Sequence, residues 1–267
     1  MASEGSALGA FVLGVIQGLT EFLPVSSSGH LVLFQQFIPV AGDALLFDLV
    51  LHVGTLVPVL YFYRDWVGKL ILDPFVGEGP FLEREGVRWI GYIVLASIPT
   101  AIIGIAFKDQ FDALFSTPAT LAVTFTITAL LLLLTSRLDR SYLDKPLSPG
   151  VVLLLGIAQG LAITPGISRS GTTIAVALLL GLGREKAARF SFLMSVPAIV
   201  GGLLLELRDA ELGDVDPVQL AVGGGASLVT GYLALVLLVQ VVRQGRMAWF
   251  AGYLFLVAGF SLYRAMA

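Results

Sequence analysis

Long apolar runs alternate along the chain with two apolar stretches that polar residues interrupt. A helix needs about 20 apolar residues to cross a bilayer, and six runs are long enough to do so. The interrupted stretches, 6–37 and 150–183, each contain two shorter apolar pieces around a polar turn. Because such a turn is tolerated at membrane depth only where protein or water covers it, each stretch predicts a re-entrant helical hairpin. The predicted spans are 44–63, 88–107, 117–136, 187–207, 218–242 and 247–264.

The two interrupted stretches are copies of one pattern, offset by 142 residues. The copies differ in charge, because Glu21 becomes Ile163 and Ser27 becomes Arg169 in the second one. His30 is replaced as well, by Thr172. One copy therefore holds an acid and a histidine, and the other holds an arginine. Identical residues stand at the paired positions Leu13/Leu155, Gly14/Gly156, Gln17/Gln159, Gly18/Gly160, Leu19/Leu161, Ser26/Ser168, Ser28/Ser170 and Gly29/Gly171.

This pattern predicts an all-α polytopic membrane protein with a single domain over residues 1–267, built as an inverted repeat. The repeats cover about 6–136 and 150–264, and each half is a re-entrant helical hairpin followed by three transmembrane helices. An odd number of crossings in each half inverts the second half relative to the first. Hairpins that enter from opposite sides then meet near the middle of the protein.

Composition supports this class and excludes others. The 267 residues are 57% hydrophobic and only 13% charged, with a mean hydropathy of +0.90, whereas soluble domains carry about 25% charged residues. No basic run of the kind that binds nucleic acid is present, so we expect no nucleic-acid partner. The chain has no cysteine, which excludes disulfides, thiol nucleophiles and Cys-ligated zinc.

The distribution of lysine and arginine predicts the orientation. In the inverted-repeat topology, twelve of the 16 basic residues lie on the side opposite to the two chain ends, and that side is cytoplasmic by the positive-inside rule. The ends of the chain, the mouth of the first hairpin and the opening of the site are then expected outside a cell inner (plasma) membrane. The twelve are Arg64, Lys69, Arg84, Arg88, Arg137, Arg140, Lys145, Arg184, Lys186, Arg189, Arg243 and Arg246; the outer side holds Lys108, Arg208 and Arg264.

The turn of the second hairpin is suited to binding a phosphate. Glycine and proline at Pro165-Gly166 force a turn, and the N–H groups of the helix start that follows favour anions. Arg169 adds a planar, permanently charged fork that matches phosphate oxygens. A purely structural interpretation pairs Arg169 with Glu21 of the first hairpin and uses the hydroxyls to join helices. The candidate substrate-binding residues are Ser168, Ser170, Gly171, Thr172 and Thr173.

The first hairpin carries the candidate reactive groups. Gln17 and Glu21 share one helix face, Pro24 ends that helix, and a serine at 26–28 caps the next one. Ser27 is the candidate nucleophile, with a water as the alternative, and His30 is its candidate general acid or base. Glu21 either orients these groups or holds a divalent cation together with Gln17 and phosphate oxygens. Ser26 and Ser28 are further candidates for substrate binding.

A structural interpretation of the same residues treats the serines as ordinary helix caps and His30 as a core histidine with satisfied hydrogen bonds. Glu, Ser and His on one broken helix favour the functional interpretation. Asp48 and His52 lie four apart on the next predicted span, where they either support the site, contact a metal or mark a solvent-touching helix end.

At these two stretches the chain resembles the undecaprenyl-pyrophosphate phosphatase family, the bacitracin-resistance type of integral membrane phosphatase. The family's first motif, Glu or Gln followed by three residues and Glu, reads Gln17-Gly-Leu-Thr-Glu21 here. The second motif, Pro-Gly-x-Ser-Arg-Ser-x-x-Thr, is complete from Pro165 to Thr173. The match extends over essentially the whole chain.

The resemblance implies removal of one phosphate from undecaprenyl pyrophosphate, which yields the carrier-lipid monophosphate used in cell-wall synthesis. It implies a requirement for Mg²⁺ or Ca²⁺, with a prenyl pyrophosphate and membrane lipid as partners. Because Gln17 takes the neutral option of the first motif, a metal held by a pair of glutamates is not available here. The resemblance makes Glu21, Ser27, His30 and Arg169 central, with Gln17, Ser168, Ser170 and Thr173 in support.

The rival hypothesis is a lipid-phosphate flippase or an anion transporter, since inverted repeats with broken helices are common in transporters. The Ser-His-Glu set favours hydrolysis, because binding alone needs no proton donor near neutral pH. The prenyl chain length and the formation of a homodimer are open at this stage.

Overall fold

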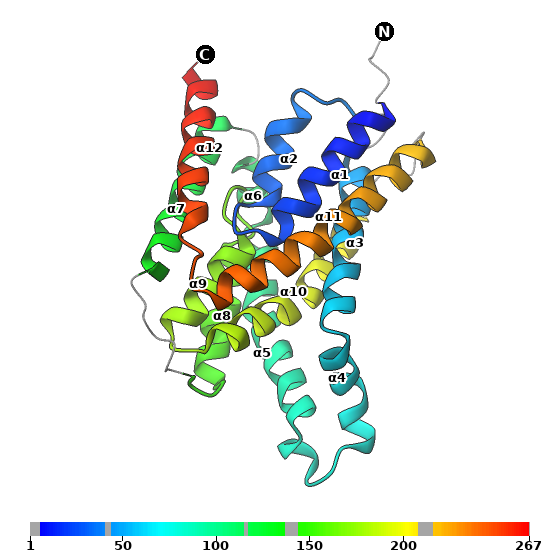
Figure 1. The fold of residues 1–267 in the computed structure, drawn as a ribbon, viewed down its shortest axis with the longest axis vertical. Helices are drawn as coiled ribbons and strands as arrows, with labels where there is room; N and C mark the ends of the chain where they lie inside the picture. Colours follow the sequence, from blue (N-terminus) through cyan, green and yellow to red (C-terminus); the bar gives the residue numbers. More distant parts are fainter. Residues whose placement is uncertain (1–5, 41–43, 115–116, 137–143, 208–215, 267) are drawn as a thin grey trace.

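In a computed structural model of the chain, the described residues are 6–40, 44–114, 117–136, 144–207 and 216–266, and they form helices joined by short turns (Figure 1). The all-α prediction is therefore confirmed for this part of the chain. In chain order the elements are α1 (Ala7–Phe22), α2 (Ser27–Gln35), α3 (Ala44–Phe62), α4 (Arg64–Val76), η1 (Phe81–Glu83), α5 (Glu85–Ala106), α6 (Lys108–Leu114), α7 (Pro118–Ser136), α8 (Pro149–Leu161), α9 (Arg169–Leu179), α10 (Arg184–Glu206), α11 (Pro217–Arg243) and α12 (Trp249–Met266).

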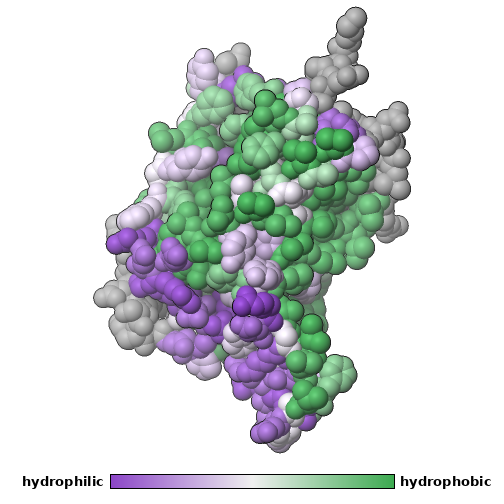
Figure 2. All heavy atoms as spheres, turned by 45° about the vertical axis from the view of Figure 1, so that its right-hand side comes forward, coloured by the Kyte–Doolittle hydropathy of each residue, from purple (hydrophilic) through white to green (hydrophobic). Residues whose placement is uncertain are grey.

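Five of the helices in the described chain, α3, α5, α10, α11 and α12, are long and apolar enough to cross a membrane. The sixth predicted run, at 117–136, is helical as α7, but its apolar part is shorter, as are α1 and α8. Apolar side chains cover most of the body in the view of Figure 2, which is the surface expected for contact with lipid.

Both interrupted stretches fold as two short helices around a turn. α1 ends at Phe22, two residues before Pro24, and Ser26 caps α2 by accepting a hydrogen bond from the Gly29 N–H at 3.4 Å. In the second copy α8 ends at Leu161, and Ser168 caps α9 through the Gly171 N–H at 3.1 Å. The two caps are the paired serines of the repeat, so the predicted helix breaks are confirmed.

Each hairpin packs its first helix on a long helix of the other half. α1 lies along α11, and α8 lies along α5. Glycines allow this close approach, because a Cβ at Gly14 would collide with the carbonyl oxygen of Gly223 on α11. The paired Gly156 on α8 meets the carbonyl oxygen of Ala96 on α5 in the same way. The two halves are therefore interlocked rather than placed side by side.

We expect Gly14→Ala to destabilise the protein, although Gly→Ala inside a helix usually stabilises it by about 1 kcal/mol. The new Cβ would push α1 away from the α11 backbone, and such overpacking costs about 1–3 kcal/mol. The measurement is thermal unfolding in detergent. Gly225→Ala on α11 is the control, because a Cβ there meets nothing within 4 Å. An unfolding temperature for Gly14→Ala equal to that of Gly225→Ala would contradict the packing argument.

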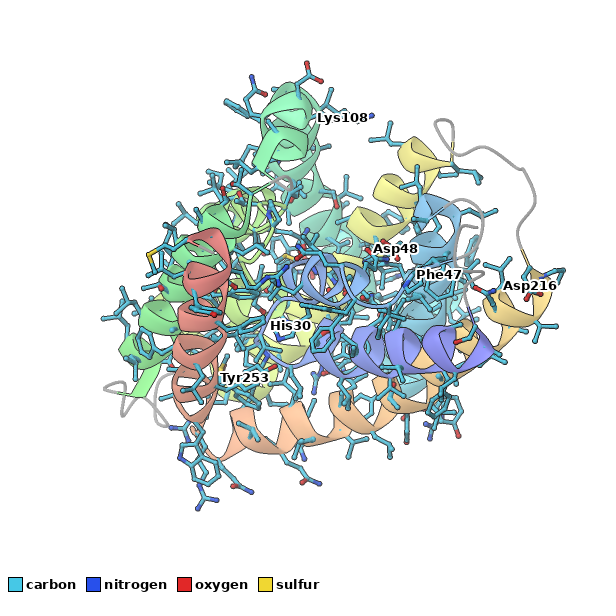
Figure 3. All side chains as sticks on the ribbon, turned by 90° about the horizontal axis from the view of Figure 1, so that it is seen from above. His30, Phe47, Asp48, Lys108, Asp216 and Tyr253 are labelled. Carbon is cyan, nitrogen blue, oxygen red and sulfur yellow. The ribbon has the colours of Figure 1, made fainter. Side chains whose placement is uncertain are left out.

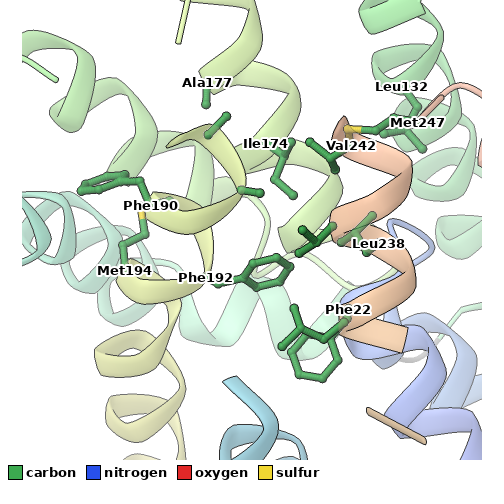
Figure 4. Packing of buried hydrophobic residues seen from close by; sticks show 14 of the residues in the cluster. Phe22, Leu132, Ile174, Ala177, Phe190, Phe192, Met194, Leu238, Val242 and Met247 are labelled. Atoms are coloured by element: carbon green, nitrogen blue, oxygen red, sulfur yellow. The ribbon is translucent and has the colours of Figure 1, made fainter. Parts of the chain in front are cut away.

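The main apolar core lies where the end of α1 meets α10 and α11. Figure 4 shows Phe22, Phe192 and Leu238 facing one another there, and all three are buried. The rings of Phe22 and Phe192 meet edge to face, with their centroids 5.8 Å apart. This packing fixes the last turn of α1, which carries Glu21.

Charged side chains gather where α10 begins and α11 ends. Lys186 binds Asp144 at 2.7 Å, and its ammonium lowers the pKa of that carboxyl by hydrogen bonding. Glu185 pairs with Arg189 at 2.9 Å and with Arg243 at 3.3 Å. α1 begins and α12 ends at the other end of the molecule (Figure 1).

Candidate active site

Glu21 is the residue on which the polar groups of the two hairpins converge. Its Oε2 accepts a hydrogen bond from Ser27 Oγ at 2.5 Å and another from Gln17 Nε2 at 3.2 Å. Its Oε1 accepts from Arg169 Nη2, at the start of α9. The Glu21 side chain is only 3% exposed, so the guanidinium supplies the counter-charge that a buried carboxylate needs.

The turns of the two hairpins touch, which brings Arg169 to Glu21. A Cβ built on Gly29 would lie 3.0 Å from the Cα of Gly166, and one built on Gly171 would lie 3.0 Å from the Cβ of Pro24. Ser170 Oγ also donates to the carbonyl oxygen of Phe22 at 2.9 Å, across the same junction. Glycine at 29 and 171 thus lets the two helix starts approach one centre.

The turn before α2 has a strained backbone. Ser26 has φ = 71°, the one positive φ of a non-glycine residue in the described chain. Its carbonyl oxygen accepts hydrogen bonds from the His30 backbone N–H at 3.3 Å and from His30 Nδ1 at 2.7 Å. This conformation presents the next residue, Ser27, to Glu21.

His30 does not reach Ser27 in this arrangement. Its Nδ1 binds the Ser26 carbonyl and its Nε2 lies 2.7 Å from the hydroxyl of Tyr253 on α12, so both ring nitrogens are occupied (Figure 3). The predicted Ser27–His30 pair is therefore not formed. Ser27 and His30 both lie at the start of α2, but the imidazole ring turns back toward the carbonyl oxygen of Ser26.

The second histidine comes closer to the acid. His52 Nε2 on α3 lies 3.9 Å from Glu21 Oε2, while its Nδ1 lies 2.8 Å from the carbonyl oxygen of Asp48. The Asp48 carboxylate accepts from Gln35 Nε2 at 2.7 Å and so ties α3 to α2. Of the two residues considered on this span, His52 borders the site, and Asp48 contacts His52 through its backbone carbonyl.

Three buried side-chain atoms of the two hairpins have no hydrogen-bond partner among the described residues: Arg169 Nη1, Thr172 Oγ1 and Gln17 Oε1. A fourth, Gln159 Oε1, lies in the paired position of the second hairpin. Buried polar groups are normally hydrogen-bonded. A guanidinium N–H and a hydroxyl left unpaired beside two helix starts are the donors that an anion would use.

The other hydroxyls of the second hairpin bind protein groups. Ser168 caps α9, and Thr173 Oγ1 hydrogen-bonds Ser191 of α10 and donates to the Arg169 carbonyl at 2.8 Å. In the first hairpin, Ser28 Oγ lies 3.4 Å from Ser26 Oγ. In this structure these side chains shape the two turns, and Thr172 has the free hydroxyl.

The oxygen donors at this site suit a hard cation whose coordination is completed by the oxygens of a phosphate. The described residues contain no group of three His, Cys, Asp or Glu side chains that would hold a metal alone. Glu21 offers a carboxylate, and the unpaired Gln17 Oε1 offers an amide oxygen. Mg²⁺ and Ca²⁺ prefer oxygen ligands, and Mg²⁺ sites often use one or two carboxylates plus substrate phosphates.

Two contacts of the site were not predicted. Thr128 on α7 accepts from the Ser168 N–H at 3.2 Å and donates to the Gly166 carbonyl at 3.3 Å, which braces the second turn. Tyr253 binds His30 over a separation of 223 residues. Both lie in apolar runs whose pattern indicates only a membrane span, so no local sequence signal marks them.

The chain matches known proteins over nearly its full length. The chain is 43% identical over 255 residues to a protein of Carboxydothermus hydrogenoformans named undecaprenyl-diphosphatase, covering 93% of each chain. It is 44% identical over 266 residues to one of the same name from Desulfosudis oleivorans, covering 96% of this chain and 97% of that one. A third, from Halothermothrix orenii, is 42% identical over 250 residues, covering 92% and 93%.

Residues 10–260 also match the family described as bacitracin resistance protein BacA. That span contains the second hairpin, the first hairpin from Ala10 onward, and all the long apolar helices but the end of the last. Together with the five apolar helices, the match establishes a multi-pass membrane protein. The chain belongs to the bacitracin resistance protein BacA family.

Proposed function

We propose that the chain hydrolyses undecaprenyl pyrophosphate to undecaprenyl phosphate and inorganic phosphate, and so recycles the carrier lipid for cell-wall synthesis. The observation that carries this function is the contact between the two hairpins, where Glu21 binds Ser27 on one side and Arg169 on the other. The relatives that match nearly the full length are named undecaprenyl-diphosphatase, which supports the same reaction.

The substrate is held by hydrogen-bond donors at the two helix starts. Arg169 Nη1, the Thr172 hydroxyl and the N–H groups at the starts of α2 and α9 bind the pyrophosphate oxygens. Positioning and charge stabilisation dominate phosphoryl transfer, so a fixed guanidinium supplies much of the acceleration. The prenyl chain lies along the apolar helices, in contact with membrane lipid.

Ser27 Oγ, or a water in its place, attacks the terminal phosphorus. A new O–P bond forms, the bond from that phosphorus to the bridging oxygen breaks, and undecaprenyl phosphate leaves. The proton of the attacking hydroxyl passes to Glu21 Oε2, which already accepts its hydrogen bond. If Ser27 attacks, a water then cleaves the phosphoserine and releases phosphate.

A divalent cation, Mg²⁺ or Ca²⁺, would be held by Glu21 and the Gln17 amide oxygen together with the pyrophosphate. When bound, it supplies charge neutralisation for the phosphate oxygens. Removing the cation with a chelator is expected to lower phosphate release by about 100-fold or more. Adding back excess Mg²⁺ or Ca²⁺ restores it. Full turnover in the chelator would show that the protein side chains suffice.

The proposed architecture is an inverted repeat with two re-entrant hairpins. A reciprocal contact supports it: Gly29 approaches Gly166, while Gly171 approaches Pro24. Gly171 lies 142 residues after Gly29, and Gly166 lies 142 residues after Pro24. A two-fold axis between the hairpins would relate the two contacts in this way. The packing of α1 on α11 and of α8 on α5 supports the same relation.

The proposed orientation has both chain ends outside the plasma membrane, with the site opening outward. The start of α1 and the end of α12 lie at one end of the molecule (Figure 1), which supports a common side for both. The excess of lysine and arginine on the opposite side supports its assignment as cytoplasmic.

The decisive experiment is phosphate release by the purified protein in detergent micelles, with undecaprenyl pyrophosphate and shorter prenyl pyrophosphates as substrates. Detergent abolishes the two sides of the membrane, so transport cannot produce phosphate. Release that requires the protein supports hydrolysis. Tight binding of the lipid without release would instead support the flippase or anion transporter.

A further inference from the structure

The hydrogen bonds of His30 determine where its proton lies. Nδ1 faces the carbonyl oxygen of Ser26 at 2.7 Å, and a carbonyl only accepts, so Nδ1 carries the hydrogen. A neutral imidazole has one N–H, so Nε2 is the acceptor. The hydroxyl of Tyr253, 2.7 Å from Nε2, therefore donates to it.

Aromatic packing holds the ring in this position. The Tyr253 ring stacks on His30 with a centroid distance of 5.7 Å and an angle of 11°. Phe125 of α7 contacts the imidazole edge to face at 5.4 Å. Figure 3 shows His30 and Tyr253 facing each other between α2 and α12. His30 is 2% exposed, so rotation toward Ser27 would require these rings to separate.

The His30 imidazole stabilises the strained backbone turn at Ser26. A positive φ at a residue with a side chain costs about 1–3 kcal/mol unless its surroundings impose it. At Ser26 the surroundings include the bond from the Gly29 N–H to the side chain and two hydrogen bonds from His30 to the carbonyl oxygen, of which the Nδ1 bond, at 2.7 Å, is the shortest. The residue after Ser26 is Ser27, whose Oγ lies 2.5 Å from Glu21 Oε2.

We propose that Tyr253 is a positioning residue of the hydrolytic site: through His30, it holds the Ser26 turn in the conformation that presents Ser27 to Glu21. α12 thereby contributes a residue to the site that α1 and α2 form. In this arrangement His30 contributes by donating its Nδ1–H to the backbone carbonyl oxygen of Ser26. Tyr253 affects turnover in this way only if the chain is a phosphatase, as proposed above.

The first test measures the hydrogen bond itself and needs no turnover. The chain has two histidines, so nitrogen NMR of the full chain labelled with ¹⁵N-histidine in micelles resolves both rings. The His30 signals are those that disappear in His30→Asn. We expect Nδ1 to be protonated, and the Nε2 signal to move downfield in Tyr253→Phe as it loses its donor. An unmoved Nε2 signal, or a protonated Nε2 in the unmodified protein, would overturn the assignment.

The second test measures kinetics. Tyr253→Phe keeps the stacked ring and removes the hydroxyl, and we expect kcat for phosphate release to fall about tenfold, as for one neutral hydrogen bond. KM should change less than about twofold, because the phosphate ligands are untouched. Tyr263→Phe on the same helix is the matched control, since Tyr263 is exposed and the described chain offers its hydroxyl no partner. Equal kcat values for the two variants would overturn the proposed role.

A double variant separates positioning from general damage. Asparagine at 30 retains an N–H near the place of Nδ1 but has nothing at the place of Nε2. We therefore expect Tyr253→Phe to have no further effect on kcat in the His30→Asn background. A second tenfold loss there would show that Tyr253 acts independently of His30. If the unmodified protein releases no phosphate, the proposed function fails, while the NMR result still decides the contact.

Discussion

Replacing Arg169 with alanine is expected to reduce phosphate release from prenyl pyrophosphates by about 10³-fold or more, the range found for guanidinium groups that stabilise phosphoryl transfer. Two losses combine in this variant. The buried Nη1, which has no partner among the described residues, disappears, and so does the counter-charge of Glu21. The measurement is kcat/KM in micelles with saturating divalent cation.

Arg169→Lys separates charge from shape. A lysine keeps the positive charge but has no planar fork, so it cannot bind Glu21 through one nitrogen and phosphate through the other. We expect it to recover part of the loss, well below the unmodified protein. Arg264→Ala is the control, since Arg264 is exposed and contacts Gln36 and Phe37 rather than Glu21. Near-normal turnover in Arg169→Ala would remove Arg169 from the site.

Replacing Glu21 with glutamine is expected to lower turnover by about 10²–10⁴-fold, the contribution of a well-placed general base. The amide matches the carboxyl in size but cannot take the proton of Ser27. It also leaves the Arg169 guanidinium, whose side chain is 22% exposed, without a counter-charge. Breaking such a buried pair costs about 3 kcal/mol or more, so the unfolding temperature should fall too.

An added anion distinguishes these two effects of Glu21→Gln. Phosphate or pyrophosphate should raise the unfolding temperature of this variant more than that of the unmodified protein, because the free guanidinium gains a partner, while turnover stays low. Glu185→Gln is the matched control: the Glu185 carboxylate is 57% exposed, against 3% for Glu21, so losing its pairs with Arg189 and Arg243 should cost at most about 1 kcal/mol. Unchanged turnover in Glu21→Gln would exclude Glu21 as the proton acceptor.

Local features of the site were predictable because they depend on neighbours in sequence. Pro24 ends α1 since it fixes φ and lacks an N–H, and Ser26 and Ser168 cap the helices that follow. The Gln17–Glu21 hydrogen bond follows from the four-residue spacing on one helix. Even Arg169 and Glu21, 148 residues apart, could be paired in advance, because the inverted-repeat hypothesis predicted that the two polar turns meet.

The side-chain directions within that centre could not be predicted in the same way. The sequence alone determines the apolar spans, the two broken helices and the polar residues that these helices carry, because hydropathy and backbone preferences act locally. Only the tertiary structure decided that His30 turns away from Ser27, that Thr173 faces Ser191, and that Tyr253 bonds His30. Each of these depends on which rotamer fits between helices brought together by packing, and a one-dimensional pattern does not contain that information.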